Sequence, residues 1–258
     1  MMYEAITLDI EADIAVLTLN RPAVMNAMNT QMRAEILHAV RHSASAARVL
    51  VLTGAGSAFC SGQDLSDRGV VGKIDLERSL REDYTPMLTA IAESPIPTIS
   101  AVNGPAAGAG ANLALSADVV IAADTAYFLQ AFTRIGLMPD AGGTFTLPRS
   151  IGMAKAMGAA LFAEKINSQQ AESWGLIWEV AEPDGFDALW KQRAAHLANG
   201  PTVAYQHTKT ALRESLHNSY DQQLLLEAKL QGQCGKTRDF KEGVLGFLQK
   251  RLPNFEGR

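Results

Sequence analysis

The sequence predicts an α/β fold built on parallel strands and followed by a helical C-terminal region. Three apolar runs, "RVLVLTG", "TISAVNG" and "DVVIAA", have the unbroken hydrophobicity of strands that are buried on both faces. Segments with the apolar period of helices lie between them, and strand signals almost vanish after Gly152. Because strands that alternate with helices usually pair in parallel, these observations favour the α/β class.

The first half of the chain opens with a predicted β-hairpin from about Ile6 to Leu19. Apolar and polar residues alternate there on both sides of an acidic turn, Glu11-Ala12-Asp13. A helix is expected next, because Asn29 is a suitable N-cap and apolar residues then recur at helical spacing, at Met32, Ile36, Leu37 and Val40. A second helix is expected over residues 75–93, with a kink at Pro86.

The second half is predicted to be mostly helical. Helical patterns cover residues 153–162, a segment with Ser168 as its N-cap, and then residues 186–199, 202–216 and 220–234. The sequence Asn199-Gly200-Pro201 joins a flexible residue to one that cannot continue a helix. We therefore expect a core domain over residues 1–199 and a helical C-terminal region over residues 200–258.

Composition and charge exclude several classes of protein. With 47% hydrophobic and 19% charged residues, the 258-residue chain has the composition of a soluble globular protein. A formal net charge of -4 without a dense basic block argues against nucleic acid as a partner. No apolar run is long enough to span a membrane, and the start at Met1–Glu4 lacks the features of a signal peptide. We therefore expect no membrane partner and a cytoplasmic location.

The cysteines and histidines indicate neither a disulfide nor a metal site. Cys60 and Cys234 lie far apart and form no Cys-x-x-Cys motif, so both are expected to be free thiols, with Cys60 as a packing residue. His38 and His42 have the spacing of two metal ligands on a helix, but no third ligand accompanies them. We therefore expect solvated histidines and no metal.

Two glycine-rich loops follow predicted strands, "VLTGAGSAFCSGQDL" at residues 51–65 and "VNGPAAGAGANLAL" at residues 102–115. Neither matches the Gly-x-Gly-x-x-Gly dinucleotide fingerprint or the P-loop. Two such loops can instead direct backbone N–H groups at one carbonyl oxygen and so form an oxyanion hole. The second loop leads into a predicted helix over residues 112–117, whose dipole would add to that field. The structural alternative is tight packing of a strand against a helix.

A single acid stands in the stretch "RIGLMPDAGGTFTLPRSIG", residues 134–152. Asp140 lies there between Pro139 and the small residues Ala141-Gly142-Gly143. An aspartate in this setting is commonly a turn or helix-capping residue, because its short side chain bonds nearby backbone N–H groups. Capping is therefore the structural alternative to any chemical role for Asp140.

Taken together, these motifs resemble the crotonase superfamily, also called the enoyl-CoA hydratase/isomerase family. The matching stretches are "LNRPAVMNAMN", "VLTGAGSAFCSGQDL", "ISAVNGPAAGAGANLALSADVVIAAD", "IGLMPDAGGTFTLPRSIG" and "EGVLGFLQKRLPNF". The resemblance implies a spiral of ββα turns that carries an acyl-CoA site, and a helical C-terminal region that builds homo-trimers or hexamers. It also implies acyl-CoA thioesters as substrates and no cofactor, since coenzyme A enters as part of the substrate.

The same resemblance implies roles for particular residues. The backbone N–H groups of Gln63 and Ala109 would hold the thioester oxygen. Contacts to substrate or CoA are expected from a larger set, namely Ala23, Ser61, Asp64, Leu65, Gly108, Phe132, Phe247 and Lys250. For Asp64 we expect a loop-ordering role, and Phe247 and Lys250 match tail positions that often reach CoA across a subunit boundary.

The positions of the acidic residues distinguish the branches of the family that this sequence resembles. Hydratases use two glutamates, and the matching positions here are Asn112 and Phe132, which cannot titrate. Asp140 instead matches a position where isomerases place an acid, and its context resembles most the isomerases that act on ring-epoxidised phenylacetyl-CoA in phenylacetate catabolism. Phe128, Phe132 and Phe145 would line a pocket that raises the pKa of the acid and suits an aromatic or alicyclic acyl group.

The resulting hypothesis is an acyl-CoA isomerase that shifts or forms double bonds conjugated to the thioester. Asp140 would move a proton between two carbons while the two amides hold the enolate. Two alternatives stay open: an enoyl-CoA hydratase that uses Asp140 alone, and a CoA-thioester-binding protein without turnover.

Overall fold

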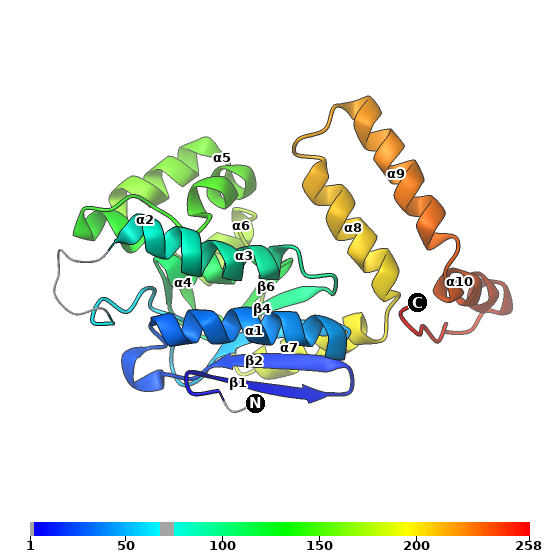
Figure 1. Ribbon diagram of the computed structural model, residues 1–258, viewed down its shortest axis with the longest axis horizontal. Helices are drawn as coiled ribbons and strands as arrows, with labels where there is room; N and C mark the ends of the chain where they lie inside the picture. Colours follow the sequence, from blue (N-terminus) through cyan, green and yellow to red (C-terminus); the bar gives the residue numbers. More distant parts are fainter. Residues whose placement is uncertain (1–2, 68–74) are drawn as a thin grey trace.

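A six-stranded sheet forms the centre of the core (Figure 1). The computed structural model describes residues 3–67 and 75–258, so Met1 and Met2 lie outside the described residues. The strand order is β1-β2-β3-β4-β6-β9, and only the β1–β2 pair is antiparallel. Its strands are β1 (Ile6–Glu11), β2 (Ile14–Leu19), β3 (Val49–Gly54), β4 (Thr98–Val102), β6 (Val119–Ala122) and β9 (Glu179–Val180). A second sheet, in the order β5-β7-β8, contains β5 (Ala106–Ala107), β7 (Tyr127–Leu129) and β8 (Lys165–Asn167).

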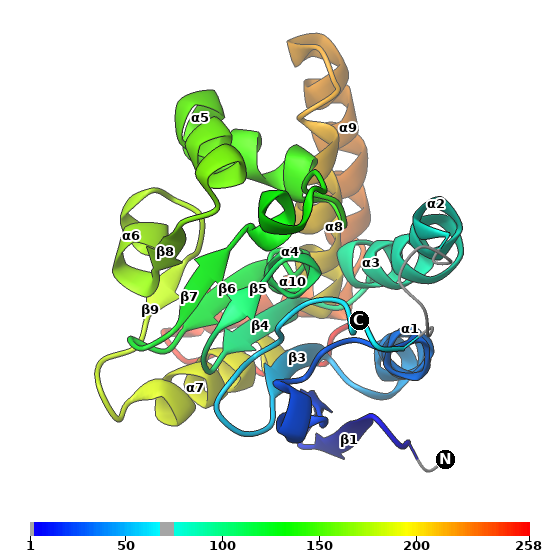
Figure 2. The same cartoon turned by 90° about the vertical axis from the view of Figure 1, so that its left-hand side faces the viewer.

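Different helices cover the two faces of the central sheet (Figure 2). Along β3, Leu50 and Leu52 pack with α1 (Thr30–Ala46) and α3 (Thr85–Ala92), whereas Val49 and Val51 pack with α7 (Phe186–Ala198). Successive side chains of a strand point to opposite faces, so a strand covered on both sides has no polar face. This is why β3 has a continuous apolar sequence. The remaining core helices and turns are η1 (Pro22–Val24), α2 (Leu76–Ser79), η2 (Leu80–Tyr84), α4 (Ala109–Ala114), η3 (Ala131–Ile135), α5 (Gly143–Phe162) and α6 (Ser168–Ser173).

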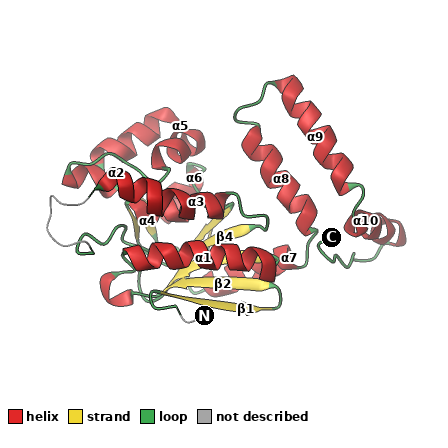
Figure 3. Ribbon diagram, in the orientation of Figure 1, coloured by secondary structure: helices red, strands yellow, loops and turns green. Residues whose placement is uncertain are grey.

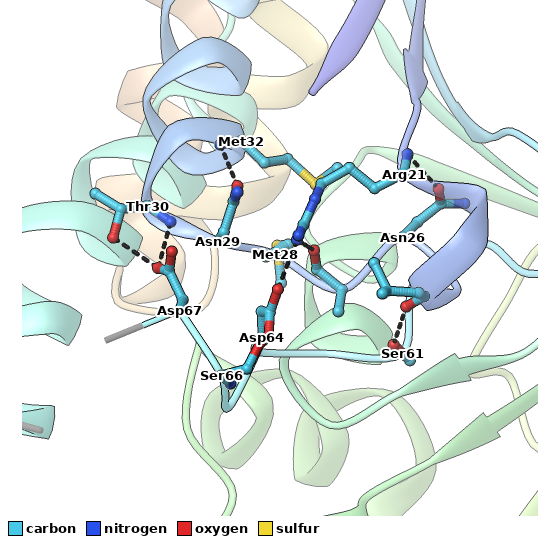
Figure 4. Close-up of polar contacts among 12 residues, drawn as sticks. Arg21, Asn26, Met28, Asn29, Thr30, Met32, Ser61, Asp64, Ser66 and Asp67 are labelled. Atoms are coloured by element: carbon cyan, nitrogen blue, oxygen red, sulfur yellow. Dashed lines mark hydrogen bonds and ion pairs between the residues drawn. The ribbon is translucent and has the colours of Figure 1, made fainter. Parts of the chain in front are cut away.

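Most of the predicted elements are confirmed. The hairpin forms β1 and β2, and the three apolar runs form β3, β4 and β6. Asn29 caps α1, since its Oδ1 accepts a hydrogen bond from the backbone N–H of Met32 at 2.8 Å (Figure 4). The kink expected at Pro86 takes the form of a π-helical turn, η2, which ends where the Thr85 N–H donates to the Leu80 carbonyl. Pro86 then occupies the first turn of α3.

The predicted N-cap of α6 is wrong by one residue. Asn167 caps the helix, because its side chain accepts from the Gln170 N–H while the Gln170 side chain accepts from the Asn167 N–H. This reciprocal capping box satisfies two N–H groups at once. The Ser168 hydroxyl instead donates to the Asp124 carbonyl at 2.7 Å.

One helix start, one additional helical segment and two strands differ from the prediction. The helix expected over residues 112–117 begins at Ala109. The helix expected over residues 153–162 is the part of α5 that follows the non-helical residue Gly152, and α5 also includes a helical segment before Gly152 that was not expected. The strands β8 and β9 follow Gly152, where hardly any strand signal was expected. They are two or three residues long, which is too short to show a period in the sequence.

An arm of three helices projects from the core (Figures 1 and 3). It consists of α8 (Thr202–Glu214), α9 (Tyr220–Cys234) and α10 (Arg238–Gln249). The Asp118 carboxylate anchors α8, with Lys209 Nζ at 2.7 Å and Arg213 Nη2 at 2.8 Å. Arg48 donates to the carbonyl of Phe255 at 3.1 Å, which fastens the end of the chain to the core.

A largely apolar groove of about 890 Å³ lies between the three helices of the arm. Phe247 and Leu248 line it and are 84% and 70% exposed. In the described part of the chain, no helix has the length and apolarity needed to cross a membrane. The domain boundary at residue 199 and the cytoplasmic location stay predictions.

Candidate active site

The loop after β3 is held by the segment that precedes α1. Asn26 is fully buried and donates through Nδ2 to the carbonyls of Ala55 and Ala58 at 2.9 and 2.8 Å. Its Oδ1 accepts a hydrogen bond from the Arg21 N–H at 2.9 Å (Figure 4). The buried amide therefore fixes the course of the loop, because leaving any of these groups unpaired would cost free energy.

Asp64 orders the same loop. Its carboxylate lies 2.8 Å from Arg21 Nη1 and accepts from the Ser66 hydroxyl at 2.6 Å and the Ser66 N–H at 3.0 Å (Figure 4). The hydrogen bond from the Ser66 hydroxyl is the main cause that lowers the pKa of Asp64, and Arg21 acts in the same direction. The Asp64 carboxylate is thus ionised, and its oxygens are bonded to Arg21 and Ser66.

Three more predicted contact residues lie along the edge of this loop. Ala23 is exposed in η1, and Leu65 is 55% exposed. Ser61 joins the loop to the η1 segment, since its N–H donates to the Met25 carbonyl at 2.9 Å. Ser61 and Leu65 thus lie two residues from Gln63 along the chain, and Ala23 lies in the η1 segment that Ser61 adjoins.

The two predicted donor N–H groups are both unpaired. The Met28 N–H donates to the Gly62 carbonyl at 2.7 Å, and the Met28 carbonyl accepts from the Asp64 N–H at 3.0 Å. The N–H of Gln63 takes no part in this pairing. Ala109 is the first residue of α4, where the N–H has no partner within the helix. Within residues 3–67 and 75–258, neither N–H has a hydrogen-bond partner.

Glycines bring these two loops into close contact. A Cβ built on Gly62 would lie 3.6 Å from the Ala109 nitrogen and 2.9 Å from the Ala107 carbonyl oxygen. Gly62 has φ of 102° and Gly108 has φ of 54°, which are conformations that favour glycine. The predicted donor segments therefore lie side by side with their N–H groups unpaired, which are two of the conditions for an oxyanion hole.

Asp140 lies between η3 and α5 with its side chain partly buried. Its Oδ1 is buried and has no hydrogen-bond partner among the described residues. Burial raises the pKa of the carboxyl from 3.8 to about 6. The N-cap of α5 is Gly142, with no side-chain hydrogen bond, so the capping alternative for Asp140 is wrong. A half-buried acid with a raised pKa and no partner is a candidate proton carrier.

A buried pair of amides holds the backbone at Asp140. Asn112 Nδ2 donates to the Asp140 carbonyl at 2.7 Å, and Gln130 Nε2 donates to Asn112 Oδ1 at 2.9 Å. Asn112 and Gln130 are 3% and 2% exposed. Because Asn112 and Ala109 share helix α4, this contact links the position of Asp140 to that of the second predicted donor.

The three phenylalanines do not form one pocket. Phe132 is 6% exposed, and its Cζ would lie 3.9 Å from a Cβ on Gly108, which places its ring beside the second loop. Phe128 is buried in the core. Phe145 is 46% exposed, and the Arg149 guanidinium lies 3.7 Å from its ring centroid, so the prediction that Phe145 lines a buried pocket is wrong. Phe145 lies near the start of α5, on a side of the helix that leaves its ring partly exposed to solvent.

Phe247 and Lys250 are not brought to this site within one chain. Both are exposed at the end of α10, on the arm, while α4 and the start of α5 belong to the core (Figure 1). Lys250 is the left-handed C-cap of that helix. Within one chain they therefore lie apart from the site described above, and their contact with CoA stays a prediction.

Several residues of the site gave no signal in the sequence. Gln130 acts through a contact with a distant segment, and Arg21 and Asn26 lie in the matching stretch "LNRPAVMNAMN", but nothing in the sequence shows which groups any of the three contact. Cys60 is fully buried, and burial raises the pKa of its thiol to about 12, so it is no nucleophile. In the described residues, no group of histidine, cysteine or carboxylate side chains could hold a metal ion.

The fold defines the class of this protein. The structure superposes on a solved enoyl-CoA hydratase from Bacillus anthracis with a TM-score of 0.91 and 28% sequence identity, covering 99% of this chain and 100% of that one. This is the crotonase fold, in which the predicted ββα core precedes a helical C-terminal region.

The sequence comparison defines the family. The model of the enoyl-CoA hydratase/isomerase family matches residues 9–258, and the chain belongs to that family, the crotonase superfamily. It is 56% identical over 258 residues to a Rhodobacter capsulatus protein named "probable enoyl-CoA hydratase". It is 44% identical over 262 residues to the 1,2-epoxyphenylacetyl-CoA isomerase of Escherichia coli, and both alignments cover 100% of each chain.

Proposed function

We propose that the protein is an acyl-CoA isomerase that uses Asp140 as its single proton carrier. The observation that carries this proposal is the buried, unpartnered carboxylate oxygen of Asp140, a residue whose backbone is bonded to helix α4, together with two adjoining loops that have free N–H groups. These are the groups that proton transfer next to a thioester requires: a base with a raised pKa and donors for the oxygen that becomes negative.

The proposed reaction proceeds through an enolate. The thioester oxygen accepts hydrogen bonds from the N–H groups of Gln63 and Ala109, while Asp140 removes a proton from one carbon of the acyl chain. The same carboxyl group then returns the proton to another carbon, so the double bond moves. One oxyanion donor typically contributes about 10²- to 10³-fold in rate and a positioned base about 10²- to 10⁴-fold, so neither would suffice alone. No redox step or Lewis acid enters this sequence, and we propose that no cofactor is needed.

The neighbouring residues favour isomerisation over hydration. Hydratases of the family work with two glutamates, and this chain carries Asn112 and Phe132 at the matching positions. The Asn112 amide is already engaged with Asp140 and Gln130. A second acid to activate water is therefore lacking at these positions. The name of the Rhodobacter capsulatus relative favours the alternative of a hydratase that works with Asp140 alone.

The acyl group we propose is aromatic or alicyclic. Phe132 beside the second loop suits a ring, and the Escherichia coli relative is named for an epoxidised phenylacetyl-CoA. We therefore propose a role in phenylacetate catabolism, with the ring epoxide of phenylacetyl-CoA as substrate.

Two substrates and a pH series test the proposal. A 3-enoyl-CoA should gain the absorbance of a conjugated thioester, whereas crotonyl-CoA should lose little of it. Because a base must be ionised, kcat/KM for the isomerisation should rise with pH through about 6 and then level off. Faster hydration of crotonyl-CoA than isomerisation would support the hydratase, and binding without turnover of either substrate would support a CoA-thioester-binding protein.

We also propose that the arm mediates assembly into trimers or hexamers. An apolar groove with exposed Phe247 and Leu248 is typical of a surface that another protein covers. A second copy would cover it and could bring Phe247 and Lys250 to the neighbouring site. Light scattering after size exclusion should give a trimer or hexamer, and Leu248→Glu should shift it toward monomer while Ile10→Glu, on the hairpin, should not. A monomeric wild-type protein would contradict this proposal.

A further inference from the structure

Five buried side-chain polar atoms lack a hydrogen-bond partner among the described residues. They are Arg33 Nε, Tyr84 Oη, Ser94 Oγ, Ser100 Oγ and Asp140 Oδ1. Buried polar atoms are normally paired, because an unpaired one costs free energy. One of the five belongs to the proposed base, and two belong to side chains in contact with each other, Arg33 and Tyr84. This pair requires an explanation of its own.

Tyr84 is connected to the first oxyanion loop through Arg33. Its side chain is 1% exposed, and the Arg33 guanidinium lies 4.9 Å from its ring centroid. Arg33 Nη1 donates to the Met28 carbonyl at 2.9 Å, and Met28 is the residue paired with Gln63. The tyrosine therefore packs directly on the group that supports the backbone opposite the first donor.

The backbone places this tyrosine at an unusual position. Tyr84 is the last residue of the π-helical turn η2 and the buried residue of that turn. A π turn adds a residue to the helix and changes the direction of the side chains around it, and such turns occur often at functional sites. In η2 the turn carries Tyr84 into the core while Arg81 and Glu82 stay exposed.

The surroundings leave the hydroxyl proton without an acceptor. Arg33 can only donate hydrogen bonds, so it can approach the hydroxyl oxygen but cannot accept its proton. Burial is the main cause that raises the pKa of Tyr84, and the negative charge of Asp140 acts in the same direction. The hydroxyl thus stays protonated and can donate a hydrogen bond. Both Tyr84 Oη and Asp140 Oδ1 are buried atoms that lack a hydrogen-bond partner among the described residues.

We infer that Tyr84 is a specificity-determining residue whose hydroxyl donates a hydrogen bond to an oxygen atom on the acyl group. This inference rests on the proposed function, because it places the acyl group between Asp140 and Tyr84. It narrows the substrate class to acyl-CoA thioesters that carry an oxygen in addition to the thioester carbonyl. A purely hydrocarbon chain would leave the buried hydroxyl unpaired in the complex and would bind less tightly for that reason.

Binding of unreactive analogues tests the inference. The probes are phenylacetyl-CoA and its 2-, 3- and 4-hydroxyphenyl analogues, titrated calorimetrically into wild-type protein and Tyr84→Phe. In wild-type protein at least one hydroxylated analogue should bind more tightly than phenylacetyl-CoA. In Tyr84→Phe this preference should fall by about 3- to 10-fold, the value of one neutral hydrogen bond.

Two comparisons make the result decisive. Tyr220→Phe, at an exposed position on the arm, should keep the wild-type preference. Tyr84→Phe should unfold at a denaturant concentration close to that of wild type, since the hydroxyl proton has no acceptor and only the Arg33 guanidinium approaches the hydroxyl oxygen. A wild-type protein without any preference, or a preference that persists in Tyr84→Phe, would overturn the inference. So would a pH midpoint of activity that moves upward in Tyr84→Phe for every substrate, because the hydroxyl would then serve Asp140 rather than the acyl group.

The outcomes separate this inference from the proposed function. Calorimetric binding requires no turnover, so the preference can be measured even if the protein isomerises none of the substrates. Absence of isomerisation together with a preference that depends on Tyr84 would contradict the proposed function alone. Isomerisation that depends on Asp140 without such a preference would contradict the role of Tyr84 alone.

Discussion

Replacement of Asp140 by asparagine is expected to lower kcat for isomerisation by about 10²-fold or more. Asparagine has almost the shape of aspartate but cannot accept and return a proton. The backbone contacts of the loop do not involve the carboxyl group, because Asn112 and Gly143 both donate to the Asp140 carbonyl. KM and the affinity for CoA should therefore change little. Steady-state kinetics with a 3-enoyl-CoA measures both quantities.

The stability of the same variant separates catalysis from a structural role. The pKa of Asp140 is raised in the folded protein, so the native state holds a proton that the unfolded chain releases between about pH 4 and 6. Stability from this group is therefore lost as pH rises through that window, and asparagine does not lose it. At pH 8, Asp140→Asn should unfold at a urea concentration equal to or above that of wild type. The control is Asp9→Asn on the exposed side of β1, which should change neither rate nor stability. An unfolded Asp140→Asn protein, or one that retains most of its rate, would contradict the proposed role.

Replacement of Gly62 by alanine is expected to lower kcat/KM by about 10²-fold, the effect of losing one oxyanion donor. A Cβ at this position would meet the Ala107 carbonyl oxygen at 2.9 Å, and the backbone has φ of 102°. The two loops must then move apart, which separates the N–H groups of Gln63 and Ala109. Because the thioester oxygen becomes more negative in the enolate, kcat should fall more than KM rises.

The matched control for this variant is Gly175→Ala. Gly175 also has a positive φ, of 79°, but its added Cβ would meet only the Ser150 carbonyl, at 3.6 Å. It therefore shares the backbone strain without the close contact, and its kcat/KM should match that of wild type. If Gly62→Ala keeps its full activity while circular dichroism shows a native fold, then the two amides do not act together on one oxygen.

The core elements could be predicted because their signals are local. An unbroken apolar run such as that of β3 requires cover on both faces, and the side chain of Asn29 caps the helix that immediately follows it. The loops of Gln63 and Ala109 and the acid at Asp140 could also be singled out as candidates, because their small residues and their motif context are visible in the sequence, and their catalytic roles stay predictions.

The remaining parts of the site depend on contacts between distant segments. Gln130 reaches Asn112 across 18 positions of sequence, and Tyr84 meets Arg33 from a different helix. Nothing in the neighbourhood of Gln130 or Tyr84 along the chain marks them as part of a site. The prediction for Phe145 failed for a related reason, because nearness to Asp140 in sequence does not decide which face of α5 a side chain occupies.

The reciprocal amides of Asn112 and Gln130 also limit how this enzyme could diverge. A glutamate in place of Asn112, as in the two-acid relatives, would set a carboxylate against the Asp140 carbonyl that now accepts a 2.7 Å hydrogen bond. Asn112 also lies so close to Gly143 that a Cβ built on Gly143 would be 2.5 Å from Asn112 Nδ2, so a change at either position must be accommodated by the other. Under the proposed function, a mutational path from isomerisation to hydration would therefore pass through a defective intermediate unless residues on α5 and at position 130 changed together. The candidate site would then be constrained by epistasis between these positions.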